Sequence, residues 1–203
     1  MTSVTKGKAT STKDALLSAA MTELLAAPEA EFRVENILAN TNASFSSLYH
    51  HFGNREGLII AAQIEIFRTP MIGGIAVFLA ELQKVQNIED LSKVLRAGIE
   101  GTTGPNSLAG RQAQLLILAS SISRPELAQA IAKEQALAAE RISGAFLELQ
   151  KRGVLKPEVQ VTQVAQFILA TVVGQIVLDV GAGEFNLEKW RETLYRALMA
   201  QFQ

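Results

Sequence analysis

The residue types that most often do chemistry are scarce in this 203-residue sequence. The two histidines, His50 and His51, are adjacent, and there are no cysteines. A Ser–His–Asp triad could form only around that one position, and neither a thiolate metal site nor a His-rich metal cluster is available. The acidic pair Glu89 and Asp90 stands where a helix is expected to begin, where carboxylates favour the helix dipole. We therefore expect no catalytic residues, no metal, no cofactor and no enzymatic activity.

The histidines belong to a stretch, residues 34–52, that predicts two short helices joined by a tight turn. Asn42 stands where the turn needs a positive φ, which asparagine tolerates better than most residues. Ser44 can cap the second helix. Leu48 and Phe52 lie four residues apart and would pack on Ile37. The stretch therefore predicts a helix-turn-helix.

The face opposite Leu48 and Phe52 offers Phe45, Ser46, Tyr49 and His50. In a helix-turn-helix the second helix enters the major groove of DNA by its N-terminal residues. Phe45 also shares a helical stripe with Leu48 and Phe52, so it could instead be a core residue. We expect His51 to be a packed, structural histidine.

Elements with a helical period must position this motif, because apolar residues recur every three or four positions and β-branched alternation is scarce. The predicted fold class is all-α, with about nine helices. Thr12 is expected to cap the first helix, which ends before Pro28. Short helices are expected around 34–38 and at 44–52, and longer ones at 55–85 (bent near Pro70), 88–101, 107–123, 125–152, 161–180 and 187–202.

The sequence resembles the TetR family of transcriptional regulators over roughly residues 12–62. The most specific part is Leu48-Tyr49-His50-His51-Phe52 followed by Gly53-Asn54-Arg55-Glu56-Gly57. Thr12-Lys13, Ala19-Ala20 and Val34-Glu35-Asn36-Ile37 also agree with the family. The resemblance implies a TetR-like fold: an N-terminal three-helix DNA-binding domain at 1–54, with a flexible tail at 1–11, and a C-terminal ligand-binding and dimerisation domain at 55–203.

Carried over by position, the resemblance implies a set of DNA-binding residues, and four positions depart from the family pattern. Arg33 replaces a Ser or Thr cap but could reach a phosphate, Asn42 replaces the turn glycine, and Phe45 and Ser46 replace a polar or basic residue and a glycine. Phe45 could pack on a thymine methyl group. The implied DNA-binding set is Arg33, Ser44, Phe45, Ser46, Ser47, Tyr49, His50 and Arg55.

Charge argues for a weak electrostatic contribution to DNA binding. Residues 1–60 hold five Lys or Arg against six acids, a sum of −1, while the whole chain also carries −1. Phosphate neutralisation normally supplies much of DNA affinity. We therefore expect a shallow dependence of DNA affinity on salt.

The C-terminal domain is expected to hold a small, mainly apolar effector in a pocket with few hydrogen-bonding groups. The candidate lining residues are Phe67, Met71, Phe78, Leu116, Ser120 and Phe146, each of which could equally be ordinary core. The last two helices carry apolar residues on more than one face, more than one chain can bury, and the family pairs them across a homodimer. The candidate dimer residues are Phe167, Ala170, Thr171, Gly174, Trp190, Leu194 and Leu198.

The function predicted from these features is a ligand-responsive repressor that binds a palindromic double-stranded DNA operator as a homodimer. No signal peptide is evident, and the longest apolar run, 164–180, contains Gln166, Gln175 and Asp179, so we expect a cytoplasmic protein with no membrane partner. The alternative is a TetR-like ligand-binding protein whose DNA binding is weak or lost. A helical enzyme or a purely structural helical dimer is less consistent with the motif.

Overall fold

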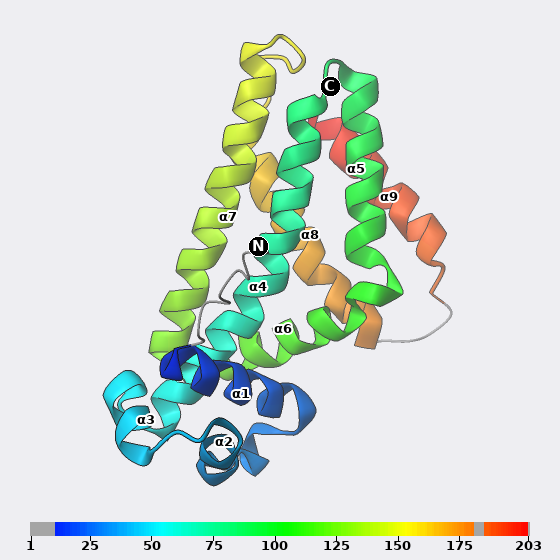
Figure 1. The fold of residues 1–203 in the computed structure, drawn as a ribbon. Helices are drawn as coiled ribbons and strands as arrows, with labels where there is room; N and C mark the ends of the chain where they lie inside the picture. The colour runs from blue at the N-terminus through cyan, green and yellow to red at the C-terminus, as the bar shows by residue number, and fades with distance from the viewer. Residues whose placement is uncertain (1–10, 181–184, 203) are drawn as a thin grey trace, which may run out of the picture. The chain divides into compact units, whose positions relative to one another are not determined.

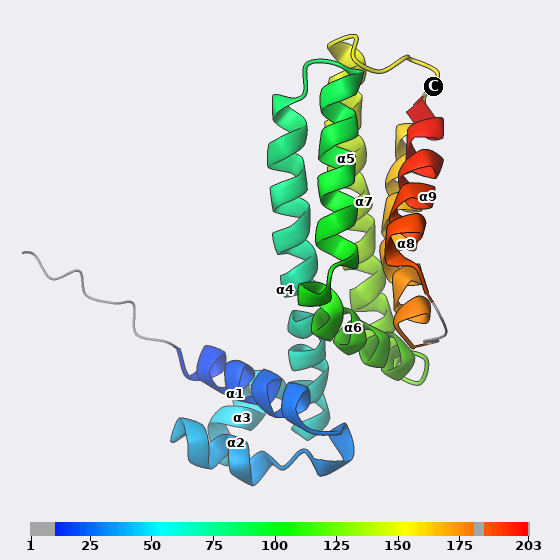
Figure 2. The ribbon, with the colours of Figure 1, turned by 90° about the vertical axis from the view of Figure 1, so that its right-hand side faces the viewer.

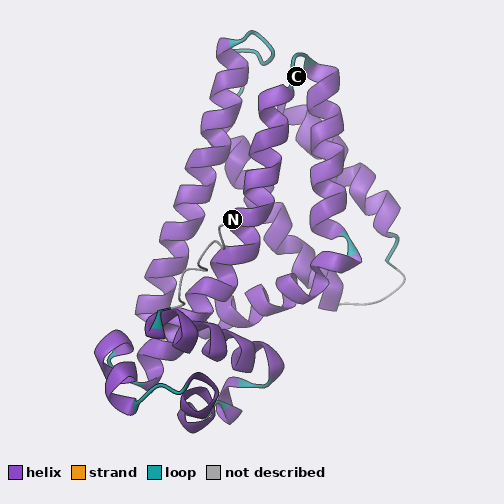
Figure 3. Cartoon of the chain, viewed as in Figure 1, coloured by secondary structure: helices purple, strands orange, loops and turns teal. Residues whose placement is uncertain are grey.

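The computed structural model describes residues 11–180 and 185–202, and every regular element within those ranges is a helix (Figures 1 and 3). Nine α-helices and three short 3-10 helices account for the described part. The all-α prediction is confirmed. The chain divides after Ile66 into two compact units.

The first unit contains α1 (Thr12–Ala26), α2 (Val34–Thr41), α3 (Phe45–Phe52) and the first turns of α4 (Arg55–Lys84), with the 3-10 helix η1 (Glu29–Glu31) between α1 and α2. One side chain from each helix meets in its core: Leu16, Ile37, Leu48 and Leu58 are all fully buried or nearly so. The cap of α1 differs from the prediction. Ser11, one residue before Thr12, has extended backbone and accepts the Asp14 N–H at 3.1 Å.

The second unit contains the rest of α4 and α5 (Ile88–Thr103), α6 (Leu108–Ser121), α7 (Pro125–Lys151), α8 (Val161–Val180) and α9 (Leu187–Met199), with η2 (Pro105–Ser107) and η3 (Ala200–Phe202). Within it, α7 packs along α8 and α5 packs along α9 (Figure 2). The largest core cluster surrounds Phe146 of α7, Leu91 and Leu95 of α5, and Phe202.

Local signals explain most of the helix ends. Asn87 caps α5 by accepting the Asp90 N–H at 2.9 Å, and Pro125 begins α7 as predicted. Gly153, just past α7, has the positive φ of 74° that glycine adopts readily. Helix α6 is shorter than the predicted 107–123: it begins after the 3-10 turn of residues 105–107, and it ends at Ser121.

Two of the described helices, α4 and α8, are long and apolar enough to cross a membrane by length and composition. The core helices of soluble proteins can have the same length and composition. Helix α8 is the more unusual of the two, because only 22% of its most apolar 18-residue window is buried within the single chain. Much of its apolar surface therefore needs another explanation.

Candidate functional site

The second helix of the motif, α3, begins and ends as the sequence predicts. The Ser44 hydroxyl accepts the Ser47 N–H at 3.1 Å, and the two hydroxyls also lie 3.1 Å apart. Gly53, with φ of 77°, donates its N–H to the Tyr49 carbonyl at 2.9 Å and ends the helix. Leu48 is 1% exposed, so α3 is pinned to the core by one face.

The turn between α2 and α3 depends on Asn42, the residue that ends α2. Its φ of 52° and ψ of 26° place it in the left-handed region, and it is the single non-glycine residue of the described chain with a positive φ. The prediction that asparagine would replace the usual glycine in this conformation is confirmed. The turn brings α3 against α1.

The face of α3 away from the core is open to solvent. Tyr49 is 58% exposed and Phe45 is 50% exposed, and Ser46 and His50 are exposed as well. The alternative that Phe45 is a core residue is therefore wrong. The prediction of a packed His51 is also wrong, since its ring is exposed on the last turn of the helix. The exposed surface is aromatic and hydroxyl-bearing, with no Lys, Arg, Asp or Glu in α3.

The two arginines predicted to reach phosphates, Arg33 and Arg55, are exposed. Both donate hydrogen bonds to backbone carbonyls of residues 29–32, between α1 and α2. Arg33 Nη1 donates to the carbonyls of Ala30 at 2.9 Å and Phe32 at 3.3 Å. Arg55 Nη2 donates to the carbonyls of Glu29 and Phe32, both at 3.3 Å, and its guanidinium lies 5.4 Å from the centre of the Phe32 ring. Each guanidinium has five N–H donors, so these bonds leave further donors for a phosphate.

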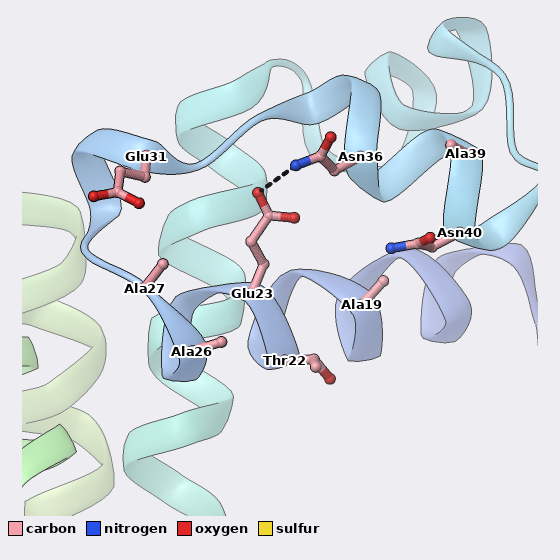
Figure 4. A pocket seen from close by; sticks show the side chains of 9 residues that line it. All are labelled: Ala19, Thr22, Glu23, Ala26, Ala27, Glu31, Asn36, Ala39 and Asn40. Carbon is pink, nitrogen blue, oxygen red and sulfur yellow. Dashed lines mark hydrogen bonds between the residues drawn. The ribbon is translucent and has the colours of Figure 1, made fainter.

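Glu23 of α1 supports the helix-turn-helix, a structural role that the sequence analysis missed. The Arg33 N–H, at the N-cap of α2, donates to Glu23 Oε1 at 2.9 Å, and the Asn36 amide donates to the same oxygen at 3.4 Å. Arg33 makes no side-chain cap, so Glu23 supplies from another helix a partner for the N-terminus of α2 (Figure 4). Ten residues separate Glu23 from Arg33, so no local pattern indicates this bond.

A surface groove of about 620 Å³ lies between α1 and α2, around Glu23 (Figure 4). Its walls are small side chains and amides, and Glu31 adds a second carboxylate. The lining residues are Ala19, Thr22, Glu23, Ala26, Ala27, Glu31, Asn36, Ala39 and Asn40. With two acids and no base in its lining, the groove is unsuited to a phosphate.

The described part of the first unit is acidic as a whole. Residues 11–66 carry three Lys or Arg side chains and seven Asp or Glu side chains, which gives a formal charge of −4. Any binding of a polyanion by this unit would therefore depend on the local surface of α3, its hydroxyls, amides and aromatic rings, more than on net attraction.

The residues predicted to line an effector pocket separate into different environments. Phe146 is fully buried, with its ring 6.3 Å from that of Phe78 and 5.2 Å from that of Phe202, and Phe67 is 2% exposed. Met71 and Ser120 are half-buried, and the Ser120 hydroxyl accepts a hydrogen bond from Arg124. The structure contradicts the prediction that Leu116 lines a pocket. Its side chain is 71% exposed and faces solvent, because α6 turns the neighbouring Ile117 inward instead.

The residues predicted for a dimer interface also divide. The structure contradicts the prediction that Leu194 and Leu198 of α9 form the interface. They are 7% and 4% exposed and pack on Ile99 of α5 within the single chain. Trp190 is half-buried and donates its indole N–H to Gln175 at 2.6 Å. Phe167 and Thr171 are half-buried, whereas Ala170 and Gly174 are exposed.

The exposed part of α8 forms a continuous apolar stripe. Ala170, Gly174 and Val177 recur at helical spacing along it, and Val180 extends it, with Val177 70% exposed and Val180 67% exposed. No atom beyond the helix lies within 4 Å of the position that a Cβ would take on Gly174, so the backbone is open there. We call these four residues the α8 stripe.

The fold was compared with known proteins. No protein-family model matches the sequence, and no curated protein matches it significantly. Salmonella enterica GusR is similar in structure, with a TM-score of 0.68 and 21% identity over 94% of this chain and 95% of that one. A TetR-family transcriptional regulator from Cytophaga hutchinsonii has a TM-score of 0.65 and 14% identity over 94% of this chain and 92% of its own.

A third similar structure is that of Thermus thermophilus FadR, a TetR-family transcriptional repressor solved in complex with lauroyl-CoA. Its TM-score is 0.65, with 14% identity over 94% of this chain and 95% of that one. Each of these likenesses covers nearly all of both chains, and each includes both the helix-turn-helix unit and the helical body. The chain described here has the fold of the TetR-family transcriptional regulators.

Proposed function

We propose that this protein is a TetR-family transcriptional regulator that binds a DNA operator through α3 and responds to a small molecule bound in its helical body. The observation that carries the proposal is the exposed face of α3, where Phe45, Ser46, Tyr49 and His50 are open to solvent on a well-capped helix of a helix-turn-helix. The proposed DNA-binding domain is 1–54 and the proposed effector-binding and dimerisation domain is 55–203. We propose repression, a cytoplasmic location and no enzymatic activity.

In this proposal, the front of α3 reads the bases. The hydroxyls of Ser44, Ser46 and Ser47 hydrogen-bond base edges or nearby phosphates, and Phe45 packs on a thymine methyl group. Tyr49 and His50 lie along the phosphate backbone. Arg33 and Arg55 use their remaining donors on phosphates, and at Arg55 the N-terminus of α4 adds its own attraction for an anion.

The α8 stripe supports a homodimer. An apolar helix with so much exposed surface is the expected face for a second copy, and Gly174 would allow two α8 helices to approach closely. A two-fold dimer would place two copies of α3 about one DNA turn apart, roughly 34–36 Å, which calls for a palindromic operator. Helix α9 contributes by bracing α8 from within the chain, through the Trp190–Gln175 hydrogen bond and through the cluster in which Leu194 and Leu198 pack near Phe167 of α8.

The effector is proposed to be small and mainly apolar. The core around Phe78 and Phe146 consists of aromatic and aliphatic side chains. The similar Thermus FadR was solved with lauroyl-CoA, whose acyl chain is apolar and agrees with this chemistry, whereas its coenzyme A part is large and anionic. A ligand can release the protein from DNA only by binding more tightly to a body conformation whose two α3 helices misfit the operator.

Selection from a pool of random DNA duplexes tests the proposal. The wild-type protein should enrich a palindromic sequence, whereas the Tyr49→Ala variant, with its fold and dimer intact, should enrich that sequence much more weakly. Circular dichroism and light scattering establish that both proteins are folded and have the same mass. A folded, dimeric wild-type protein that enriches no duplex would contradict the DNA-binding function.

A second candidate function is a ligand-binding protein of the same fold that has weak or lost DNA binding. The formal charge of −4 over residues 11–66 favours it. It predicts that apolar ligands raise the thermal stability of the protein while no duplex is preferred. The same selection therefore separates the two candidates.

A further inference from the structure

Helix α6 is held to the second unit by unusually little apolar burial. Only two of its 14 residues are buried, Ile117 and Arg111. Leu115 and Leu116, which a helix of this composition would be expected to bury, are 38% and 71% exposed. Because helices in proteins are stabilised mostly by packing an apolar face, the position of α6 must depend heavily on its one buried charged side chain.

Arg111 makes four hydrogen bonds from a side chain that is 5% exposed. Its Nε and Nη2 atoms donate to the two carboxylate oxygens of Asp179 on α8, at 2.6 Å and 2.9 Å. Its Nη1 atom donates to the carbonyls of Thr102 at 2.7 Å and Gly104 at 3.1 Å. Those carbonyls lie at the C-terminus of α5, where a helix leaves carbonyls without partners. One guanidinium thus joins α5, α6 and α8.

The polar contacts continue to α9. Gln175, which is 2% exposed, donates to Asp179 Oδ1 at 3.4 Å and accepts the Trp190 indole N–H at 2.6 Å. Arg191, the residue after Trp190, donates to the Thr103 hydroxyl at 2.9 Å. A buried polar network with every member bonded specifies one arrangement of its helices, and removing one member leaves the others unsatisfied.

We propose that Arg111 and Asp179 are positioning residues that form a joint for α6: breaking the pair releases α6 locally while the other helices of the second unit stay folded. The bond is bidentate and largely buried, so removing either partner leaves an uncompensated charge, which costs more than the intact pair contributes. Little apolar surface then holds α6 in place. The face of α8 away from Asp179 carries the α8 stripe, so, if the proposed homodimer is correct, the joint also connects α6 to the dimer helix.

Hydrogen–deuterium exchange on the full-length protein, followed by mass spectrometry of peptides, tests the joint without DNA or an effector. In Asp179→Asn and Arg111→Met, amides of residues 108–121 should exchange faster than in the wild type, by about tenfold or more. Amides of α7 should change less than twofold. Arg111→Lys, which keeps the charge but loses the bidentate geometry, should give an intermediate increase in α6.

The matched control is Arg96→Met, which removes an arginine from the exposed Arg96–Glu192 pair between α5 and α9, where the N···O distance is 2.9 Å. It should leave exchange in α6 unchanged. If Arg111→Met does not fold, the near-isosteric Asp179→Asn decides the test alone. Equal acceleration across α5, α7 and α8, or no acceleration in α6, would overturn the proposal. Neither result would bear on DNA selection, so failure of the joint and failure of the proposed function are distinguishable.

Discussion

At the scale of single residues, the exposed aromatic rings of α3 are the most specific feature of the first unit. An exposed Tyr49 and Phe45 on one short helix add nothing to the core, and exposing them to water has no benefit for folding. Their position on a helix with no charged side chain makes hydroxyl and apolar contacts the means by which α3 would read DNA. The proposed function therefore depends on a few named side chains.

Replacing Tyr49 with alanine should weaken binding to the selected duplex by about tenfold or more, because a hydrogen bond from its hydroxyl to a charged phosphate contributes about 1.5–3 kcal/mol. The unfolding midpoint should not change, since the ring is 58% exposed. Fluorescence anisotropy with labelled duplex measures the affinity. Tyr195→Phe, at the other tyrosine of the chain, is the control and should bind as the wild type does. Equal affinities for wild type and Tyr49→Ala would remove Tyr49 from the interface.

Glu23 is expected to stabilise the first unit and not to contact DNA. Replacing it with alanine removes the oxygen that accepts the Arg33 N–H at the N-terminus of α2, and should lower the free energy of unfolding by about 1 kcal/mol, the usual contribution of a cap. Urea denaturation followed by circular dichroism measures the change. Glu31→Ala, at the other carboxylate of the same groove, should lower the free energy of unfolding by less than half as much. An equal loss in both variants would show that charge, and not the bond to the Arg33 N–H, is responsible.

At the scale of elements, the turn between α2 and α3 depends on the backbone conformation of Asn42. At φ of 52° an alanine is strained, so Asn42→Ala should destabilise the protein by about 1–2 kcal/mol. Asn42→Gly should be neutral or slightly stabilising, because glycine adopts this conformation without a Cβ clash. Thermal unfolding of the two variants beside the wild type makes the comparison. Similar losses in both would mean that the Asn42 side chain, and not its conformation, matters.

The stability that the Arg111–Asp179 pair contributes to the joint should depend on pH. The Arg111 guanidinium, by hydrogen bonding, lowers the pKa of the Asp179 carboxyl below its ordinary value. A carboxyl with a lowered pKa in the folded state contributes stability above its unfolded pKa of about 3.9, and this stability is lost as the pH falls through the lower, folded value. The difference in unfolding free energy between wild type and Asp179→Asn should therefore be constant near neutral pH and shrink below about pH 4. A difference that begins to shrink near pH 6 would contradict the assignment to Asp179.

The elements that the sequence predicts well are those defined by neighbouring residues. Asn42 at the turn and Ser44 at the cap of α3 are local signals, and the structure has both in the predicted roles. The cap that Glu23 provides and the pair between Arg111 and Asp179, 68 residues apart, are long-range and leave no periodic trace. Ser11 rather than Thr12 caps α1 because two adjacent hydroxyl residues offer the same chemistry.

The apolar faces of α8 and α9 show a different limit of sequence reasoning. Helical periodicity identifies which residues share a face, but it does not say whether that face meets its own chain or a second copy. Leu194 and Leu198 bind within the chain, against Ile99 of α5, while Val177 and Val180 remain outside. The distinction needed the positions of α5 and α9, which are tertiary information.

At the scale of the whole molecule, the α8 stripe should decide the oligomeric state. Val177→Glu places a charge at the centre of the stripe, where burial against a second copy would cost several kcal/mol, so the variant should be monomeric at concentrations where the wild type is dimeric. Because Val177 is 70% exposed in the single chain, the fold should be kept. Val77→Glu, at a residue that is 67% exposed on α4, is the control and should leave the mass unchanged. Light scattering measures both. A dimeric Val177→Glu protein would exclude the stripe from the interface.

The charge of the molecule separates the two candidate functions. An acidic first unit predicts that non-specific attraction to DNA is weak, so that most of the affinity comes from base contacts and shape. A regulator of this kind would discriminate strongly between duplexes while depending little on salt. A protein that has lost DNA binding would show neither discrimination nor affinity.

The measurement that tests the central claim most directly is an anisotropy titration of the wild-type protein against the selected duplex and a scrambled duplex of the same composition, at two salt concentrations. The account predicts tight binding to the selected duplex, a preference for it that persists at the higher salt, and a shallow loss of affinity between the two. Equal affinity for both duplexes, falling steeply with salt, or binding to neither, would contradict the claim that α3 reads a DNA sequence.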